Sequence, residues 1–306
     1  MIKSIRNLSF IAIALFSACT DSQKTDEKQT NALLDTVSLS NRAIALAYQN
    51  GDKIVATSID TLKQISFGSA TDPAISPDGN KFAYTVSDSS GHKSVWIADM
   101  ENKMQSRLVV NYPDYFGASW APDGKNIAIN VLSKNGLETV ALVKTDQSGY
   151  VTLDGSSNTN LYGPTWKNDT EVLVHDLKNL YIYTANGKKI DTKNIASQLG
   201  IPLNITKNSR FFFVENGTQL IFNAGNAATG NNMVQSVYLI NLADKKLSKL
   251  SPAEVHVSHL FVTSDDRIFF SGTENGADQS KIYTSDLKGT IKILIDKGSN
   301  PTATLK

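Results

Sequence analysis

Apolar and polar positions along the chain follow one arrangement five times: a short apolar strand, a polar turn and a second apolar strand. The five segments are Ala74–Val86, Ser119–Val131, Thr165–Leu177, Phe212–Ala224 and Leu260–Gly272. Their turn residues lie 45, 46, 47 and 49 residues apart, at Asp78, Asp123, Asp169, Asn216 and Asp265. A fixed period in this range is typical of a β-propeller, in which four-stranded units repeat around an axis.

Each unit continues with two further strands rich in Val, Ile, Tyr and Phe, which favour pleated, packed strands. The third strands are expected at Ser94–Met100, Thr139–Asp146, Leu180–Gly187, Ser236–Leu242 and Lys281–Leu287. Shorter fourth strands are expected at Ser106–Val110, Tyr150–Leu153, Lys188–Asp191, Leu247–Leu250 and Ile291–Ile295. Four strands and their turns fill the period, so no helix is expected within a unit.

The two ends of the repeat region complement each other. Ala43–Tyr48, Lys53–Asp60 and Leu62–Ser66 match the second, third and fourth strands of a unit, but no inner strand precedes them. At the other end, Pro301–Lys306 has the length of one strand. A ring of sheets leaves no open edge only if it closes, so we expect the C-terminal strand to supply the missing inner strand. The predicted fold is all-β, a six-bladed β-propeller of four-stranded blades over residues 41–306.

The first two turns, Ser76–Gly79 and Ala121–Gly124, read SPDG and APDG. Proline fixes φ at about −65° at the first corner, aspartate bonds its own backbone, and glycine takes the positive φ that closes the hairpin. This structural role accounts for every residue of the turns. It is therefore favoured over the alternative, a carboxylate site at Asp78 or Asp123.

Together with the strands that follow them, Phe82–Tyr84 and Ile127–Ile129, these turns resemble the repeat of TolB-type propellers. That repeat also occurs in the propellers of prolyl-oligopeptidase-like enzymes and of some bacterial polysaccharide lyases. The resemblance covers about residues 42–306 and implies the fold without specifying an activity. About 40 residues precede the repeats, so we expect no counterpart of the N-terminal α/β domain of TolB or of the hydrolase domain of the peptidases.

Residues 1–18 have the pattern of a secretory signal peptide. Two basic residues come first, and the apolar stretch Leu8–Ala18 is too short to span a bilayer as a helix. The stretch ends in Phe16–Cys19, which resembles a bacterial lipoprotein box, and the single cysteine of the chain falls at its lipid-attachment position, Cys19. We therefore expect a lipid anchor on the membrane. The alternative is an ordinary signal peptide, cleaved or uncleaved.

Residues 19–40 are polar and of mixed charge, as in a flexible tether, which would hold the propeller about 25 Å from the membrane. The alternative is that Leu33 and Leu34 pack on the first blade. Thr20 follows Cys19, and by resemblance to enterobacterial sorting this favours the periplasmic face of the outer membrane in the bacterial cell envelope. Loss of residues 1–18 removes two basic residues and no acid, which changes the net charge from +1 to −1. A near-neutral chain without basic clusters is not expected to bind nucleic acid.

Motifs of known catalytic chemistry are absent from the sequence, which has no G-x-S-x-G, phosphate-binding loop, H-E-x-x-H or EF-hand. The four histidines are His92, His175, His256 and His259. The last two form an H-x-x-H pair whose rings fall on opposite sides of an extended segment, so we expect no metal and no cofactor. Trp120 and Trp166 occupy equivalent positions before their turns and are expected to pack between blades.

The inner strands are expected to begin at the central channel, on the face where ligands of propellers commonly bind. Their first residues mix aromatic and polar side chains, as a binding pocket does. The candidate ligand-binding residues are Asp72, Tyr115, Tyr162, Asn204 and His259, with Asn300 in the closing strand. Longer connections between blades are expected to converge on the same face. The alternative is that these residues line a water-filled channel.

Two classes of function remain open on the sequence. The first is a non-catalytic cell-envelope lipoprotein whose propeller is a scaffold for an envelope protein, a peptide or another ligand. The second is a glycan-active enzyme, a polysaccharide lyase or hydrolase, that uses acids and tyrosines at the channel mouth. A sensor domain of an envelope complex is a third interpretation.

Overall fold

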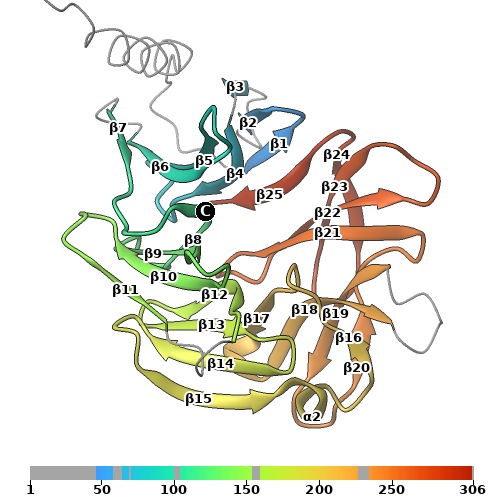
Figure 1. The fold of residues 1–306 in the computed structure, drawn as a ribbon. Helices are drawn as coiled ribbons and strands as arrows, with labels where there is room; N and C mark the ends of the chain where they lie inside the picture. The colour runs from blue at the N-terminus through green and yellow to red at the C-terminus, as the bar shows by residue number, and fades with distance from the viewer. Residues whose placement is uncertain are drawn as a thin grey trace, which may run out of the picture.

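The computed structural model describes residues 46–57, 64–68, 70–99, 104–153, 159–226 and 234–304. Within these ranges the strands form six antiparallel sheets, arranged as the blades of a β-propeller (Figure 1). The predicted all-β, six-bladed fold is therefore confirmed. The predicted signal peptide (residues 1–18), the predicted tether (residues 19–40) and Cys19 lie outside the described residues.

The first three blades follow the predicted order of strands. Blade 1 contains β25 (Ser299–Ala303), β1 (Leu46–Asn50), β2 (Lys53–Thr57) and β3 (Gln64–Gly68). Blade 2 contains β4 (Ala70–Ile75), β5 (Lys81–Ser87), β6 (Lys93–Asp99) and β7 (Met104–Arg107). Blade 3 contains β8 (Asp114–Trp120), β9 (Asn126–Leu132), β10 (Glu138–Lys144) and β11 (Tyr150–Thr152).

The remaining blades differ in that the fifth has a divided inner strand. Blade 4 contains β12 (Tyr162–Asn168), β13 (Glu171–His175), β14 (Asn179–Thr184) and β15 (Lys189–Asn194). Blade 5 contains β16 (Leu203–Asn204), β17 (Phe211–Val214), β18 (Gln219–Asn226), β19 (Gln235–Asn241) and β20 (Leu247–Lys249). Blade 6 contains β21 (Val255–Val262), β22 (Ile268–Glu274), β23 (Ser280–Ser285) and β24 (Ile291–Ile295).

The C-terminal strand closes the ring as predicted. β25 pairs antiparallel with β1, with Ala303 opposite Leu46 and Thr302 opposite Ala47. It lies at the centre of the ring, where it is the inner strand of blade 1 (Figure 1). Thr302 and Ala303 are both buried, so the closing strand is part of the core as well as of the sheet.

The core consists of apolar layers between neighbouring blades. Phe82 and Tyr84 of blade 2, for example, pack in one cluster with Ile54 of blade 1. Trp120 and Trp166 lie between blades, as predicted. The Trp120 indole Nε1 donates to the carbonyl of Ala74 at 3.0 Å, and the Trp166 Nε1 donates to the carbonyl of Ser119 at 2.8 Å; each bond reaches the preceding blade. The rings therefore supply apolar contact and a directional bond at the same interface.

The SPDG and APDG turns have the predicted structural role. Gly79 and Gly124 have φ of 75° and 69°, and the backbone amides of Asn80 and Lys125 donate to Oδ1 of Asp78 and Asp123. These carboxylates are therefore used to close the hairpins.

One helix between blades 4 and 5 was not expected from the repeat. It is α2 (Ile195–Leu199), a five-residue helix. The side chain of Asn194 caps it by accepting from the amide of Ser197, and Gly200 ends it with φ of 68°. The sequence pattern Asn…Gly at these ends is an ordinary capping signal. No helix in the described part of the chain has the length and apolar character needed to cross a membrane.

Candidate functional site

A cavity of about 470 Å³ lies at the axis of the ring, and all six blades contribute to its walls. One residue from the inner edge of each blade, at an equivalent position, lines it: Asp72, Gly117, Gly163, Arg210, His259 and Asn300. We call these six residues the axial ring. Five of them lie six residues before the turn residue of their blade, which is how the repeat fixes their position. The cavity volume falls within the range of small-ligand sites.

Four members of the axial ring have positive φ: Asp72 (51°), Gly117 (62°), Gly163 (59°) and Asn300 (49°). At each of them the pairing of the inner strand with its neighbour shifts register, so each lies in a β-bulge. Gly, Asp and Asn are the residues that tolerate the left-handed conformation. The choice of residue at this position therefore follows from the backbone, and the bulge turns the strand at the cavity wall.

Polar side chains on the second strands support the bulges. Thr85 Oγ1 accepts from the amide of Gly117 at 3.0 Å, and Ser271 Oγ accepts from the amide of Asn300 at 3.3 Å; both bonds cross from one blade to the next. Thr85 and Ser271 are buried, with 1% and 0% of their surface exposed. Their hydroxyls satisfy backbone groups that the interrupted ladder leaves unpaired.

His175 has the same supporting role between blades 4 and 5. Its Nε2 lies 2.8 Å from the carbonyl of Ser209, and its Nδ1 accepts from the amide of Leu177 at 3.3 Å. This pattern assigns the neutral ring with the proton on Nε2. Burial lowers the pKa of His175 to about 4, because the charged form would lose its hydration. His175 is therefore a structural histidine.

Blade 5 places its axial residue differently. Residues 205–210 separate β16 from β17, while only Asn223 and Ala224 separate the matching positions on β18. Asn223, which is fully buried, holds this longer excursion: its Oδ1 accepts from the amide of Arg210 at 2.8 Å and its Nδ2 donates to the carbonyl of Asn208 at 3.2 Å. The 205–210 segment is therefore bonded to its own blade through Asn223 and to the preceding blade through Ser209.

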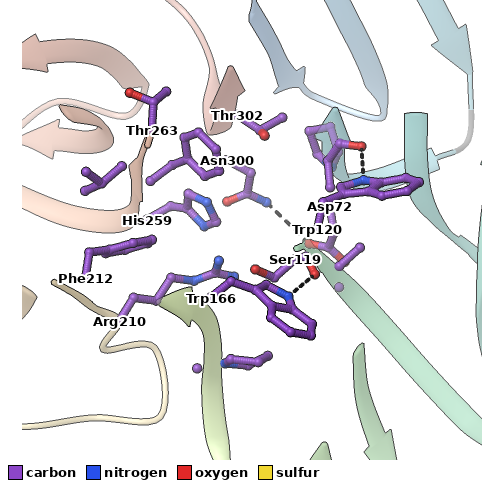
Figure 2. A pocket seen from close by; sticks show the side chains of 18 of the residues that line it. Asp72, Ser119, Trp120, Trp166, Arg210, Phe212, His259, Thr263, Asn300 and Thr302 are labelled. Atoms are coloured by element: carbon purple, nitrogen blue, oxygen red, sulfur yellow. Dashed lines mark hydrogen bonds between the residues drawn. The ribbon is translucent and has the colours of Figure 1, made fainter. Parts of the chain in front are cut away.

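The charged group that this segment carries to the axis is the guanidinium of Arg210. Figure 2 shows Arg210, His259, Asn300 and Asp72 around one space. No carboxylate of the described residues lies within 4.0 Å of the Arg210 side-chain nitrogens. Burial lowers the pKa of this arginine, whereas the negative charge of Asp72 acts to raise it.

His259 lies beside this cation. Loss of solvent contact and the charge of Arg210 hold the pKa of His259 well below its ordinary value, so the imidazole is neutral at pH 7 and offers one N–H donor and one acceptor. Asn300 Nδ2 donates to Oδ1 of Asp72 at 3.4 Å and to Oε1 of Gln49 at 3.2 Å. Asp72 Oδ2 also accepts from Thr71 at 3.2 Å. The carboxylate in the axial ring is thus held by neutral donors.

A second set of polar groups lies at the cavity margin. Glu138 lines the cavity, and burial raises its pKa while nearby Lys207 acts in the opposite direction. Burial and the charge of Glu138 raise the pKa of Tyr162. A carboxyl group with a raised pKa beside a tyrosine is a recognised arrangement for acid–base chemistry.

The structure separates the residues that the sequence indicated as ligand-binding. Asp72 and His259 line the cavity, and so does Asn300. Tyr115, expected at the channel mouth, is 1% exposed within a blade interface, where its hydroxyl donates to the carbonyl of Leu108 at 2.6 Å. Tyr162 is half-buried with its ring centre 5.9 Å from that of His175.

Asn204, the fifth predicted residue, pairs with Gly225 in the ladder of blade 5 and does not line the cavity. The displacement of these three residues has two causes: β-bulges after Tyr115 and Tyr162, and the 205–210 segment of blade 5 at Asn204. The first residue of a strand faces the axis only if the strand alternates regularly, and the bulges interrupt that alternation. Counting six residues back from each turn identifies Gly117, Gly163 and Arg210 instead. Arg210 is the functional candidate that the strand-start reasoning missed.

Metal binding finds no support in the described part of the chain, where no cluster of three or more His, Cys, Asp or Glu side chains is arranged around a common point. His256 Nδ1 accepts from the amide of Gln235 at 3.1 Å, and His92 is an exposed residue 3.3 Å from Asp114. Neither shares a site with His259.

Comparison with solved structures identifies the fold. TolB from Acinetobacter baumannii is similar with a TM-score of 0.62 and 13% identity, over 85% of this chain and 65% of TolB. A chain in the nidogen/laminin complex is similar with a TM-score of 0.58 and 11% identity, over 86% of this chain and all (100%) of that chain. Oligogalacturonate lyase in complex with manganese is similar with a TM-score of 0.52 and 12% identity, over 78% of this chain and 69% of the lyase chain.

These similarities establish a TolB-like six-bladed propeller, and at such low identity they establish the fold alone. This chain spans 65% of the length of TolB. No family model matches the sequence, and no curated protein matches it. The function must therefore be argued from the cavity.

Proposed function

We propose that this chain is a non-catalytic lipoprotein of the bacterial cell envelope whose propeller binds a protein or peptide ligand at the axial cavity. The observation that carries the proposal is the convergence of Arg210, His259, Asn300 and Asp72 on one cavity in a rigid ring. Binding sites combine a concave surface with a few placed polar groups. The similarity to a chain of the nidogen/laminin complex supports a protein ligand.

Membrane attachment is the second part of the proposal. It rests on the basic start, the apolar stretch and the single cysteine at Cys19. Cells fed a clickable fatty acid are expected to label the wild-type protein and not Cys19→Ala. Equal label on both proteins would refute the lipid anchor, and fractionation of inner and outer membranes would test the proposed outer-membrane location.

Binding can be tested by crosslinking and capture from native membranes. The wild-type protein is expected to capture a defined partner, and His259→Ala is expected to lose it because the ring lines the cavity. His92→Ala is the matched control, since that histidine is exposed beside Asp114 and does not line the cavity. Capture that is unchanged in His259→Ala, or lost equally in both variants, would contradict binding at the cavity.

A glycan-active enzyme is the alternative, and the raised pKa of Glu138 beside Tyr162 specifically favours it. A carboxyl group with a raised pKa holds its proton to higher pH than usual, which favours a role as general acid. The similarity of the propeller to oligogalacturonate lyase is consistent with this chemistry on the same fold. Turnover of a polysaccharide panel by the purified protein, abolished in Glu138→Gln, would establish the enzyme and replace the binding proposal.

A further inference from the structure

The guanidinium of Arg210 is a partly buried charged group that lines the cavity. Its backbone amide is fixed by Asn223, but among the described residues no hydrogen bond or ion pair within 4.0 Å holds its side-chain nitrogens. Arginine carries five N–H donors in a planar fork and stays charged under all physiological conditions. A partly buried, unpaired arginine is unfavourable unless a ligand supplies an anion.

The surrounding groups restrict the kind of anion. The neutral His259 ring offers a second donor beside the guanidinium, whereas Asp72 places a negative charge nearby. The cavity-lining charges are balanced, with Arg210, Lys167 and Lys207 against Asp72, Glu138 and Asp266. Such a site suits a planar anion of single charge better than a phosphate dianion, which Asp72 would repel more strongly.

Part of the remaining wall of the cavity is apolar. Phe212, Phe261, Trp166 and Pro164 line it. Phe212 lies beside Arg210 and His259 in Figure 2, with Trp166 on the other side of the guanidinium. Apolar walls reduce the local dielectric constant and so strengthen a charge-assisted hydrogen bond. They also offer a surface to an apolar substituent of the ligand.

We propose that the axial cavity binds its ligand through a carboxylate on an apolar body, with Arg210 as the fork that holds the carboxylate and His259 as an additional donor. The inference deepens the proposed function and rests on it, because it specifies the ligand of the same cavity. A small free carboxylic acid and the C-terminal carboxylate of a peptide share this chemistry.

Titration calorimetry with four probes tests the inference: 3-phenylpropionate, N-acetyl-Ala-Ala-Phe with a free carboxylate, the same peptide as its amide, and inorganic phosphate. At least one carboxylate probe is expected to bind, and the amide is expected to bind at least about tenfold more weakly than the acid. Tighter binding of the peptide acid than of 3-phenylpropionate assigns the site to a chain terminus, and the reverse order assigns it to a free acid. Binding of phosphate alone, of neither carboxylate probe, or of amide and acid equally would overturn the proposal.

Variants identify the residue responsible. Arg210→Gln is expected to weaken the better carboxylate probe at least about tenfold, and Arg210→Lys to restore part of the affinity because the charge returns without the fork. Asp72→Asn is expected to tighten binding, since it removes the neighbouring negative charge. Arg107→Gln makes the same chemical change on the outer strand β7, away from the cavity, and is expected to leave affinity unchanged.

Melting temperatures close to the wild-type value for all four variants would show that they fold. Equal affinity of Arg210→Gln and the wild type would overturn the proposal even if a protein partner is still captured from membranes. In that case the binding function survives and only the carboxylate inference fails. If Arg210→Gln has a lowered Tm, its affinity cannot be interpreted and Asp72→Asn becomes the decisive variant. Weaker binding of the carboxylate probe by Asp72→Asn would then contradict the inference.

Discussion

Gly163→Ala is expected to destabilise the protein much more than Gly117→Ala, although both glycines occupy the same axial-ring position in neighbouring blades. Their φ values are nearly equal, 59° and 62°, so an alanine meets the same left-handed strain at both sites. That strain costs about 1–2 kcal/mol. What differs is the surroundings of the added methyl group.

At Gly163 the new Cβ would meet the carbonyl of Ser209 and lie 3.0 Å from Nε2 of His175. This carbonyl cannot retreat freely, because it accepts the buried hydrogen bond of His175. Loss of that bond leaves buried polar groups unsatisfied and adds about 1–3 kcal/mol. At Gly117 the nearest atom is Nδ2 of Asn130 at 3.1 Å, the end of a side chain that can move.

The expected losses are therefore about 2–5 kcal/mol for Gly163→Ala and about 1–2 kcal/mol for Gly117→Ala. Equilibrium urea unfolding of the two variants and the wild type measures both values. At about 2–4 °C per kcal/mol for a domain of about this size, the two melting temperatures should differ by several degrees. Equal destabilisation would refute the conclusion that the bond from His175 to Ser209 holds the bulge of blade 4 against blade 5.

Three further predictions follow from the fold and the buried groups. The pKa of His175 is about 4 in the folded protein and 6.5 in the unfolded chain, so between pH 7 and pH 5 only the unfolded chain gains this proton. The free energy of unfolding should therefore fall by about 2 kcal/mol over this range. Urea unfolding should show a smaller fall with decreasing pH for His175→Gln. An unchanged pH slope would show that His175 is not buried in neutral form. Deletion of Pro301–Lys306 removes most of the closing strand and should lower Tm strongly, whereas the control deletion of Thr20–Gln29 should not. Equal Tm values for the two deletions would contradict closure of the ring by the C-terminal strand. Trp166→Phe keeps an aromatic ring but loses the hydrogen bond to the carbonyl of Ser119, so thermal unfolding should show a loss of stability of about 1 kcal/mol. Unchanged stability would show that water replaces this bond at no cost.

The repeat period was sufficient to predict the architecture, because it is set by local physics. Turn residues such as Asp78 and Gly79 have one conformational role, and apolar alternation identifies the strands on either side of them. The closing strand was also predictable, since an incomplete first unit and a spare last strand leave a single way to remove an open edge. Trp120 and Trp166 followed from their equivalent positions.

The axial ring was predicted only in part, because side-chain direction depends on the bulges. Asp72 and His259 were identified, but Tyr115 and Tyr162 were chosen as strand starts and the residues that reach the cavity, Gly117 and Gly163, have no side chain to suggest a site. Arg210 was hidden by the divided inner strand of blade 5. An unusually long polar segment before an apolar strand is the signal that would have indicated it.

The pKa shifts of the two buried histidines, His175 and His259, could not be predicted from the sequence for a related reason. His175 ends β13 and bonds a carbonyl between blades, whereas His259 lies within β21 and lines the cavity beside Arg210. Their environments are made by other blades, at sequence separations that no local pattern records. Burial and partner charge therefore had to come from the three-dimensional arrangement.

The claim that ligands bind in the axial cavity can be tested most directly by site-specific photocrosslinking within blade 6. Benzoylphenylalanine at Phe261, on the inner strand β21, would face the cavity, while the same group at Ile293, on the outer strand β24 and 51% exposed, would face solvent. Irradiation of native membranes is expected to yield a crosslinked partner or ligand from position 261 and none from position 293. Crosslinks from position 293 alone would contradict the account and place recognition on the rim of the propeller.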